Sequence, residues 1–145
     1  LVCEHLKIAF TGDCVISPRA TYISGGLSDD TPDLFGEFIV SLRRLRNYSD
    51  MLPLSGHGAH QKCLHISASK IEVHLQKELQ LVFERLSDIP QSAFSLSTHI
   101  AEKRPRFFPQ WFAFTQTMAY LRHLVATDRA IEVHTDNSIF YQRSS

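Results

Sequence analysis

The sequence predicts an α/β domain followed by an α+β domain. Residues 1–66 alternate between strand, loop, helix and strand patterns, which is the order typical of an α/β fold. Residues 67–145 contain three helical patterns and then two alternating segments, which indicate helices followed by a β-hairpin. The chain has 145 residues, 43% of them hydrophobic, which is enough for two small domains. We therefore predict one domain at 1–66 and a second at 67–145.

The first domain is predicted to hold three strands and one helix. Strands are expected at Leu1–Cys3 and Lys7–Thr11, on either side of a turn. A helix is expected to begin at Thr31-Pro32-Asp33, because threonine caps helix starts, proline suits the first helical position and aspartate suits the positive end of the helix dipole. Apolar side chains then recur at helical spacing, and we predict that the helix ends near Asn47. The apolar run Met51–Leu54 predicts a third strand.

The second domain begins with a long helical pattern. Its apolar stripe consists of Ile71, Leu75, Leu79, Val82, Phe83 and Leu86. Ser95 is predicted to cap a short second helix. A third helix is predicted at residues 110–127, with a buried stripe formed by Met118, Leu121 and Val125.

The last part of the chain predicts a β-hairpin. Ala130–His134 and Ser138–Gln142 alternate in polarity around the turn-prone pair Asp136-Asn137. Three helices followed by a hairpin are the order of elements in a winged-helix domain. We therefore predict that residues 67–145 form an α+β winged-helix domain.

Charge and cysteine content restrict the class of protein. The chain has 15 basic and 15 acidic residues, so its overall charge favours no polyanionic partner. It has no apolar run near the roughly 18 residues that a membrane span needs. The three cysteines, Cys3, Cys14 and Cys63, are odd in number and irregularly spaced, which favours a reducing compartment over a disulfide framework. We therefore expect a cytoplasmic protein without a membrane partner.

Two residues at predicted strand ends suit metal binding. Asp13 follows the strand that reads KIAFTG, and His57 lies between two glycines just after the strand Met51–Leu54. A carboxylate at the exit of a buried strand is unfavourable unless it is paired or bound to a metal. Aspartate oxygen and histidine nitrogen are both zinc ligands, and a carboxylate can bridge two metal ions. The alternative interpretation is that Asp13 caps a turn and His57 is hydrogen-bonded within a loop.

The order of these motifs resembles the second half of the metallo-β-lactamase-fold hydrolases, an αββα sandwich. The similar segments are FTGD after a strand, the helix containing SLRRL, and the turn PLSGHG. By this resemblance Asp13 bridges two metal ions and His57 is the last histidine ligand. The resemblance implies zinc as cofactor, with iron or manganese as alternatives. It also implies activation of water by two metal ions to hydrolyse an ester, thioester, lactone or phosphodiester, in a small molecule or in RNA.

Some members of this superfamily, in the hydroxyacylglutathione-hydrolase-like branch, carry an appended winged-helix domain, as predicted here. The HxHxDH motif that supplies their other metal ligands is absent from this sequence. We therefore expect the chain to be the C-terminal part of such a hydrolase, inactive without an N-terminal half. An uncovered sheet edge favours association, so a homodimer is also expected.

Three further features have two interpretations each. Tyr22 follows Asp13, the candidate metal ligand, in the sequence. It is predicted to contact substrate, or else it packs within its loop. His60 and His65 lie near His57 and form either a local metal site or ordinary surface positions. The aromatic run FFPQWFAF at 107–114 resembles a platform for stacking nucleic-acid bases, or else it packs one domain against the other.

The competing functional hypothesis is a binding module. In that case the winged helix recognises nucleic acid or a partner protein, and the α/β portion is a non-catalytic scaffold. Basic and acidic residues nearly balance in residues 70–145, which does not favour strong duplex binding.

Overall fold

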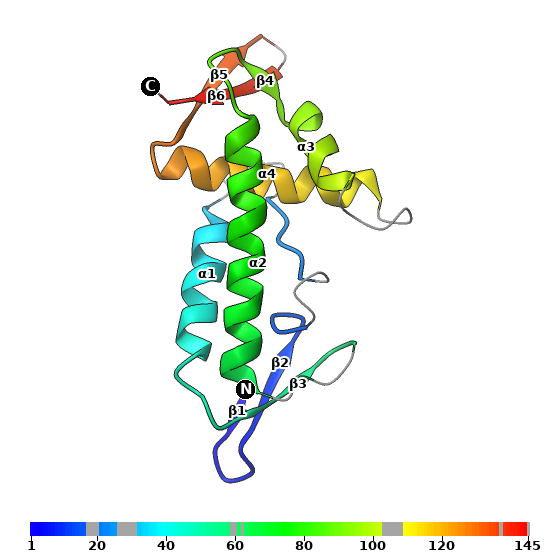
Figure 1. The fold of residues 1–145 in the computed structure, drawn as a ribbon, viewed down its shortest axis with the longest axis vertical. Helices are drawn as coiled ribbons and strands as arrows, with labels where there is room; N and C mark the ends of the chain where they lie inside the picture. The colour runs from blue at the N-terminus through cyan, green and yellow to red at the C-terminus, as the bar shows by residue number, and fades with distance from the viewer. Residues whose placement is uncertain are drawn as a thin grey trace. The chain divides into compact units, whose positions relative to one another are not determined.

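The computed structural model describes residues 1–16, 21–25, 32–58, 61, 63–102, 109–136 and 138–144. Their contacts group the chain into two compact units, one of Leu1–Thr21 with Glu37–Lys77 and one of Tyr22–Gly36 with Glu78–Ser145. Helices α1 (Leu34–Leu45) and α2 (Leu64–Arg85) contribute residues to both units (Figure 1). The predicted domain boundary between residues 66 and 67 lies inside α2, and the division into those two domains stays a prediction.

The first unit contains a three-stranded sheet. Its strands are β1 (Val2–Cys3), β2 (Ile8–Gly12) and β3 (Leu52–Ser55), in the order β1-β2-β3. β1 runs antiparallel to β2, and β2 runs parallel to β3. Parallel neighbours need a crossover connection, and the chain between β2 and β3 contains α1, as the α/β prediction requires. The two parallel strands therefore end at the same edge of the sheet.

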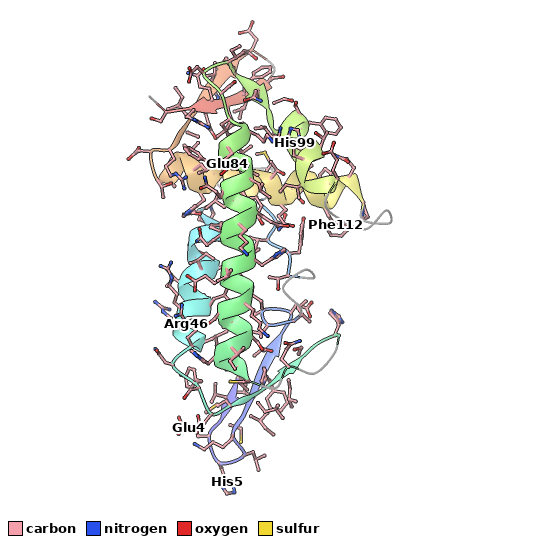
Figure 2. All side chains as sticks on the ribbon, in the orientation of Figure 1. Glu4, His5, Arg46, Glu84, His99 and Phe112 are labelled. Atoms are coloured by element: carbon pink, nitrogen blue, oxygen red, sulfur yellow. The ribbon has the colours of Figure 1, made fainter. Side chains whose placement is uncertain are left out.

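In the first unit, Arg43 of α1 and Arg46, which directly follows α1, bind one carboxylate of α2. The Arg43 Nε atom lies 2.8 Å from Glu72 Oε1, and the Arg46 Nη1 atom lies 2.9 Å from Glu72 Oε2. Glu72 is nearly buried, whereas both arginines remain partly exposed, and Figure 2 labels Arg46 at the end of α1. The fork of donors on arginine suits such a shared carboxylate. The apolar core of this unit includes Ala9, Val15, Ile39, Leu42, Met51, Leu64, Ala68, Ile71 and Leu75.

The turn between β1 and β2 is solvent-exposed and holds an ion pair at its end. Figure 2 shows Glu4 and His5 on this turn, and both are exposed. Lys7 adopts a left-handed backbone conformation with φ of 55°, and its Nζ atom lies 2.8 Å from Asp50 Oδ2. The hydrogen bond from Lys7 lowers the pKa of the Asp50 carboxyl below its ordinary value of 3.8.

We expect the variant Lys7→Met to raise the pKa of Asp50 back toward 3.8, because the variant loses both the hydrogen bond and the positive charge. The stabilisation from Asp50 is present above the unfolded-state pKa and is lost as the pH falls through the lowered folded-state pKa. An NMR titration of the Asp50 carboxyl carbon measures this change, with Lys70→Met as the exposed control. An unchanged titration in Lys7→Met contradicts the pairing.

The start of α1 is capped by Asp33. The Gly36 backbone N–H donates to Asp33 Oδ1 at 2.8 Å, which is the contact of an N-cap aspartate. The other oxygen, Oδ2, lies 2.8 Å from Nδ1 of His123, whose ring also contacts Phe35. The predicted cap Thr31 lies outside the described residues. The sequence indicated a favourable dipole position for Asp33, and the structure adds the direct capping bond.

The second unit contains helices α3 (Ala93–Ala101) and α4 (Gln110–Ala126) and a second sheet. Its strands are β4 (Gln91–Ser92), β5 (Ala130–Thr135) and β6 (Ser138–Arg143) in the order β4-β6-β5, with every pairing antiparallel (Figure 1). The hairpin of β5 and β6 confirms the predicted one, whereas the two-residue strand β4 was not predicted.

Two details of the predicted helices are wrong. Ser92, not Ser95, caps α3, because the Ser92 hydroxyl oxygen accepts the Ser95 backbone N–H at 3.1 Å. The predicted stripe on α4 is only partly buried, since Leu121 is fully buried while Met118 and Val125 remain half-buried. The fully buried positions of α4 are Ala113, Thr115, Gln116, Thr117, Ala119, Tyr120, Leu121 and Leu124.

The end of α4 follows from a local backbone motif. Asp128 adopts a left-handed conformation with φ of 55°, and its N–H donates to the carbonyl of Val125. The next N–H, of Arg129, donates to the carbonyl of Leu124 at 2.8 Å. This pair of bonds is a Schellman motif, which satisfies the last carbonyls of a helix. Within the described residues, no helix is long and apolar enough to cross a membrane.

Candidate metal centre

Asp13 and His57 meet at the edge of the first sheet. Asp13 follows β2 directly, and His57 lies two residues after β3. The His57 Nε2 atom lies 3.0 Å from Asp13 Oδ1. The side chains are 72% and 67% exposed, so this corner faces solvent. The structure therefore brings together the two residues that the sequence selected, and their role as metal ligands stays a prediction.

Backbone hydrogen bonds hold the two segments side by side beyond the strands. The Gly56 N–H donates to the Gly12 carbonyl at 3.0 Å. The Ser55 hydroxyl donates to the Val15 carbonyl at 2.5 Å. The register between β2 and β3 shifts between Phe10 and Gly12. Such an irregularity bends a strand and redirects the side chains that follow it, which positions Asp13 beside the turn that carries His57.

Gly56 permits the close approach of the Asp13 carboxylate. A Cβ atom at position 56 would lie 2.7 Å from Asp13 Oδ1. Heavy atoms do not approach so closely without a hydrogen bond, and the exposed carboxylate is the part free to move. The first glycine of the motif SGHG therefore leaves room for the Asp13 carboxylate in its observed position beside His57.

We expect Gly56→Ala to displace the Asp13 carboxylate and to lower the affinity of this corner for a divalent cation by at least about tenfold. The affinity is measured by calorimetric titration of each variant with zinc. The matched control is Gly12→Ala, where the backbone φ of 53° causes strain but the added Cβ has nothing within 4 Å. Equal losses of affinity in the two variants would contradict displacement as the cause.

The donor types and their separation fit a divalent metal ion, but their number is incomplete. In a tetrahedral site, two ligands that each lie about 2.0–2.2 Å from one zinc ion are roughly 3.3–3.6 Å apart, a little more than the 3.0 Å between His57 Nε2 and Asp13 Oδ1. A catalytic zinc usually has three protein ligands. Within the described part of the chain, no group of three or more histidine, cysteine, aspartate or glutamate side chains could hold a metal ion. His65 lies on α2 and belongs to no such group, and His60 lies outside the described residues.

Tyr22 lies in the second unit, packed against α4. Its hydroxyl group is hydrogen-bonded to the Thr115 hydroxyl group. Its ring meets the ring of Phe112 edge-on, with the centroids 4.9 Å apart and an interplanar angle of 82°. These contacts agree with the packed-loop interpretation, and the predicted contact with substrate stays a prediction.

The aromatic run at 107–114 is only partly described. Trp111 and Phe112 are exposed on the first turn of α4, and Figure 2 labels Phe112 there. The ring centroids of Trp111 and Phe114 are 6.0 Å apart, and those of Phe114 and Phe94 are 6.5 Å apart. The first two phenylalanines of the run lie outside the described residues. The ring contacts show an aromatic cluster on α3 and α4 within the second unit.

The second unit also contains a hollow of about 600 Å³ that the sequence did not indicate. Phe114 and Met118 of α4 supply part of its apolar wall. Its charged lining includes the carboxylates of Asp33 and Glu132 and the guanidinium of Arg122. Two carboxylates against one guanidinium do not suit a polyanion. This hollow therefore gives no support to the nucleic-acid hypothesis.

Solved structures with the same fold are metallo-β-lactamase proteins. One is a β-lactamase domain protein from Burkholderia ambifaria, with a TM-score of 0.80 and 22% identity over 97% of this chain and 42% of its own. Another is a metallo-β-lactamase family protein from Thermus thermophilus, with a TM-score of 0.80 and 24% identity over 97% of this chain and 43% of its own. This chain has the fold of a portion of a metallo-β-lactamase protein.

The likeness to these two solved structures establishes the fold of this chain. The chain spans less than half the length of these two metallo-β-lactamase proteins. No protein-family profile and no curated protein matches the sequence. The metallo-β-lactamase-like fold confirms the coarse prediction of the fold that was made from FTGD, SLRRL and PLSGHG.

Proposed function

We propose that this chain is part of a metal-dependent hydrolase of the metallo-β-lactamase superfamily, in its hydroxyacylglutathione-hydrolase-like branch. The observation that carries the proposal is the Asp13–His57 pair, with donor atoms 3.0 Å apart at the carboxyl edge of two parallel strands. Functional side chains of α/β folds gather at this edge. The proposed reaction is hydrolysis of an ester, thioester, lactone or phosphodiester.

Each residue at the corner has a defined task in this proposal. Asp13 offers two carboxylate oxygens, which allow it to bridge a pair of ions. His57 offers Nε2, the ring nitrogen that faces Asp13. Gly56 leaves the space that the carboxylate occupies. Bound divalent metal ions lower the pKa of water to about 7 and so supply hydroxide near neutral pH.

Zinc is the proposed metal, since aspartate oxygen and histidine nitrogen are both among its usual ligands, and iron or manganese is the alternative. The remaining ligands are proposed to come from an N-terminal half. The length of the two solved structures, more than twice that of this chain, supports this proposal.

The winged-helix assignment of residues 67–145 is part of the same proposal. The order α2, β4, α3, α4, β5, β6 and the antiparallel sheet β4-β6-β5 support it. Tyr22 is proposed as a substrate contact, and its ring is only partly buried against α4. A cytoplasmic location is proposed from the cysteines, and Cys3, Cys14 and Cys63 are all free thiols in the structure.

The proposal is tested by zinc binding to the purified chain. We expect Asp13→Ala and His57→Ala each to lower zinc affinity by at least about tenfold, because each variant removes one of two donors. The matched control is His134→Ala, an exposed histidine on β5 in the other unit. Calorimetric titration with zinc gives the affinity, and circular dichroism verifies the fold. Unchanged zinc affinity in both variants would contradict the proposal.

A further inference from the structure

The hollow of about 600 Å³ lies within the second unit. Its described lining comes from α3, α4, the sheet β4-β6-β5 and Asp33 beside the start of α1. A volume of this size is typical of pockets that take small organic molecules. The hydroxyl group of Tyr141, a buried residue of β6, lies 3.9 Å from the Met118 Sδ atom of α4. This contact joins the sheet to the helix at the hollow, so the hollow is formed by the folded unit itself.

Three phenylalanines supply apolar surface to this hollow. Phe94 comes from α3, Phe114 from α4 and Phe140 from β6. The ring centroids of Phe94 and Phe114 are 6.5 Å apart, and Phe94 is 59% exposed, so these rings are open to a ligand. Covering aromatic rings with an apolar group is favourable, and the faces of the rings also attract cations. The wall therefore favours a ligand with an apolar body, preferably an aromatic one.

Two of the charged groups at the hollow are already engaged by the protein. Asp33 Oδ1 accepts the Gly36 N–H, and Asp33 Oδ2 lies 2.8 Å from His123 Nδ1. The Arg122 guanidinium donates from Nη1 to the Gly25 carbonyl. These contacts hold the start of α1 and the loop at Gly25 against α4. The Arg122 guanidinium is therefore in part committed to the fold, which weakens it as a partner for an anionic ligand.

Glu132 is the carboxylate at the hollow with the fewest contacts. It pairs with Tyr141 across the hairpin, so the two side chains lie on the same face of the sheet. Its side chain is 29% exposed, and its partner among the described residues is His134, with Nε2 3.2 Å from Glu132 Oε2. That imidazole is 62% exposed and is a cation only when it is protonated. A partly buried carboxylate beside an apolar wall favours a positively charged hydrogen-bond donor.

We propose that this hollow binds a small organic cation with an aromatic body, of the class of arylalkylammonium ions. The aromatic body lies against Phe94, Phe114 and Met118, and the ammonium group donates to the Glu132 carboxylate. Two carboxylates and one guanidinium line the hollow, so an anion of the same shape has the less favourable charge. The site needs no metal ion and goes beyond the proposed function, on which it does not depend.

The test is an NMR titration of the whole 145-residue chain with ligands that share an aromatic body and differ in charge. The cation is naphthylethylammonium, the neutral analogue is naphthylethanol and the anion is naphthylacetate. We expect the cation to bind about tenfold more tightly than the alcohol, since a hydrogen bond to a charged group adds at least this much. The anion is expected to bind more weakly than the alcohol. The largest amide shifts are expected at Phe114, Arg122 and Glu132, which line the hollow.

Variants separate the charge from the apolar wall. Glu132→Gln keeps the size of the side chain and removes its charge, so it is expected to abolish the tenfold preference and to leave the affinity for the alcohol unchanged. Phe114→Ala is expected to weaken the binding of all three ligands, because it removes part of the wall. The control is Glu84→Gln, an exposed carboxylate of α2 in the same unit (Figure 2), which is expected to bind like the parent chain. The amide spectrum of each variant establishes that it is folded.

Several outcomes would overturn this inference. Equal affinity for the cation and the alcohol, or a preference that persists in Glu132→Gln, removes the role of the carboxylate. Tighter binding of the anion shows that Arg122 decides the charge of the ligand. Amide shifts confined to residues outside the hollow, or no binding of any of the three ligands, remove the site itself. All of these titrations are done without metal, so their failure leaves the proposed zinc binding at Asp13 and His57 unaffected.

Discussion

Gly25→Ala is expected to lower the free energy of unfolding of the second unit by about 2–3 kcal/mol, because no space exists for a methyl group at this position. A Cβ atom there would lie 2.3 Å from the backbone nitrogen of Ala119 and 2.6 Å from the carbonyl carbon of Met118. These are backbone atoms inside α4, so they cannot rotate away as a side chain can. The loop that carries Gly25 would have to move off the helix instead.

The loss follows from the contacts that this loop makes. The Gly25 N–H donates to the Thr115 carbonyl at 2.8 Å, and the Gly25 carbonyl accepts a hydrogen bond from Arg122. Ile23, two residues earlier, is buried. Moving the loop exposes this side chain, and full burial of an isoleucine contributes about 1.5–3 kcal/mol.

Urea denaturation followed by fluorescence of Trp111 measures the change, since Trp111 lies on α4 of the same unit. Gly12→Ala, in the first unit, is the control and is followed by far-ultraviolet circular dichroism, because its φ of 53° gives backbone strain without overlap. We expect it to lower stability by only about 1–2 kcal/mol. A Gly25→Ala protein as stable as the parent chain would contradict the packing of this loop on α4.

Tyr120→Ala is expected to lower the free energy of unfolding by about 3–5 kcal/mol, as for other buried aromatic side chains cut back to alanine. Tyr120 is fully buried, and its ring meets that of Phe35 edge-on at 5.3 Å. Its hydroxyl group donates to Glu78 Oε2 at 2.7 Å, and the Gln116 amide donates to the same oxygen at 2.9 Å. The side chain therefore both fills the core and partners a buried carboxylate.

Tyr120→Phe separates these two roles. It keeps the ring but removes one hydrogen bond to the buried Glu78 carboxylate, and a hydrogen bond to a charged group contributes about 1.5–3 kcal/mol. Tyr48→Phe is the matched control, because Tyr48 is exposed, and we expect its stability to change by less than about 0.5 kcal/mol. Thermal and chemical denaturation measure all three variants. If Tyr120→Phe were as stable as Tyr48→Phe, the buried hydrogen bond would be contradicted.

The parts of the fold that the sequence predicted are those with strong local signals. The helix at 110–127 and the hairpin around Asp136 agree with α4, β5 and β6 to within one or two residues. The proximity of Asp13 and His57 was also predictable, because both follow strands that run parallel in an α/β unit. Periodicity, turn residues and strand order carry this information within short segments of chain.

Other features had no local signal. The strand β4 has two residues and exists only because Gln91 and Ser92 pair with β6. Ser92 and Ser95 are equally good caps by residue type, and the start of α3 at Ala93 selects the first. The hydrogen bonds of Glu78 to Gln116 and Tyr120 join residues that are distant in sequence, so no spacing pattern reveals them.

The sequence by itself determined the class of the fold, the order of most of its elements and the two residues of the candidate metal centre. Only the tertiary structure decided that Gly56 makes room for Asp13, that Gly25 lies against α4 and that Glu78 has partners in the core. The physical reason is the distance along the chain between the residues that interact. Helix caps, turns and alternation depend on neighbours along the chain, whereas close approach and buried polar pairing depend on which distant segments the folded chain brings together.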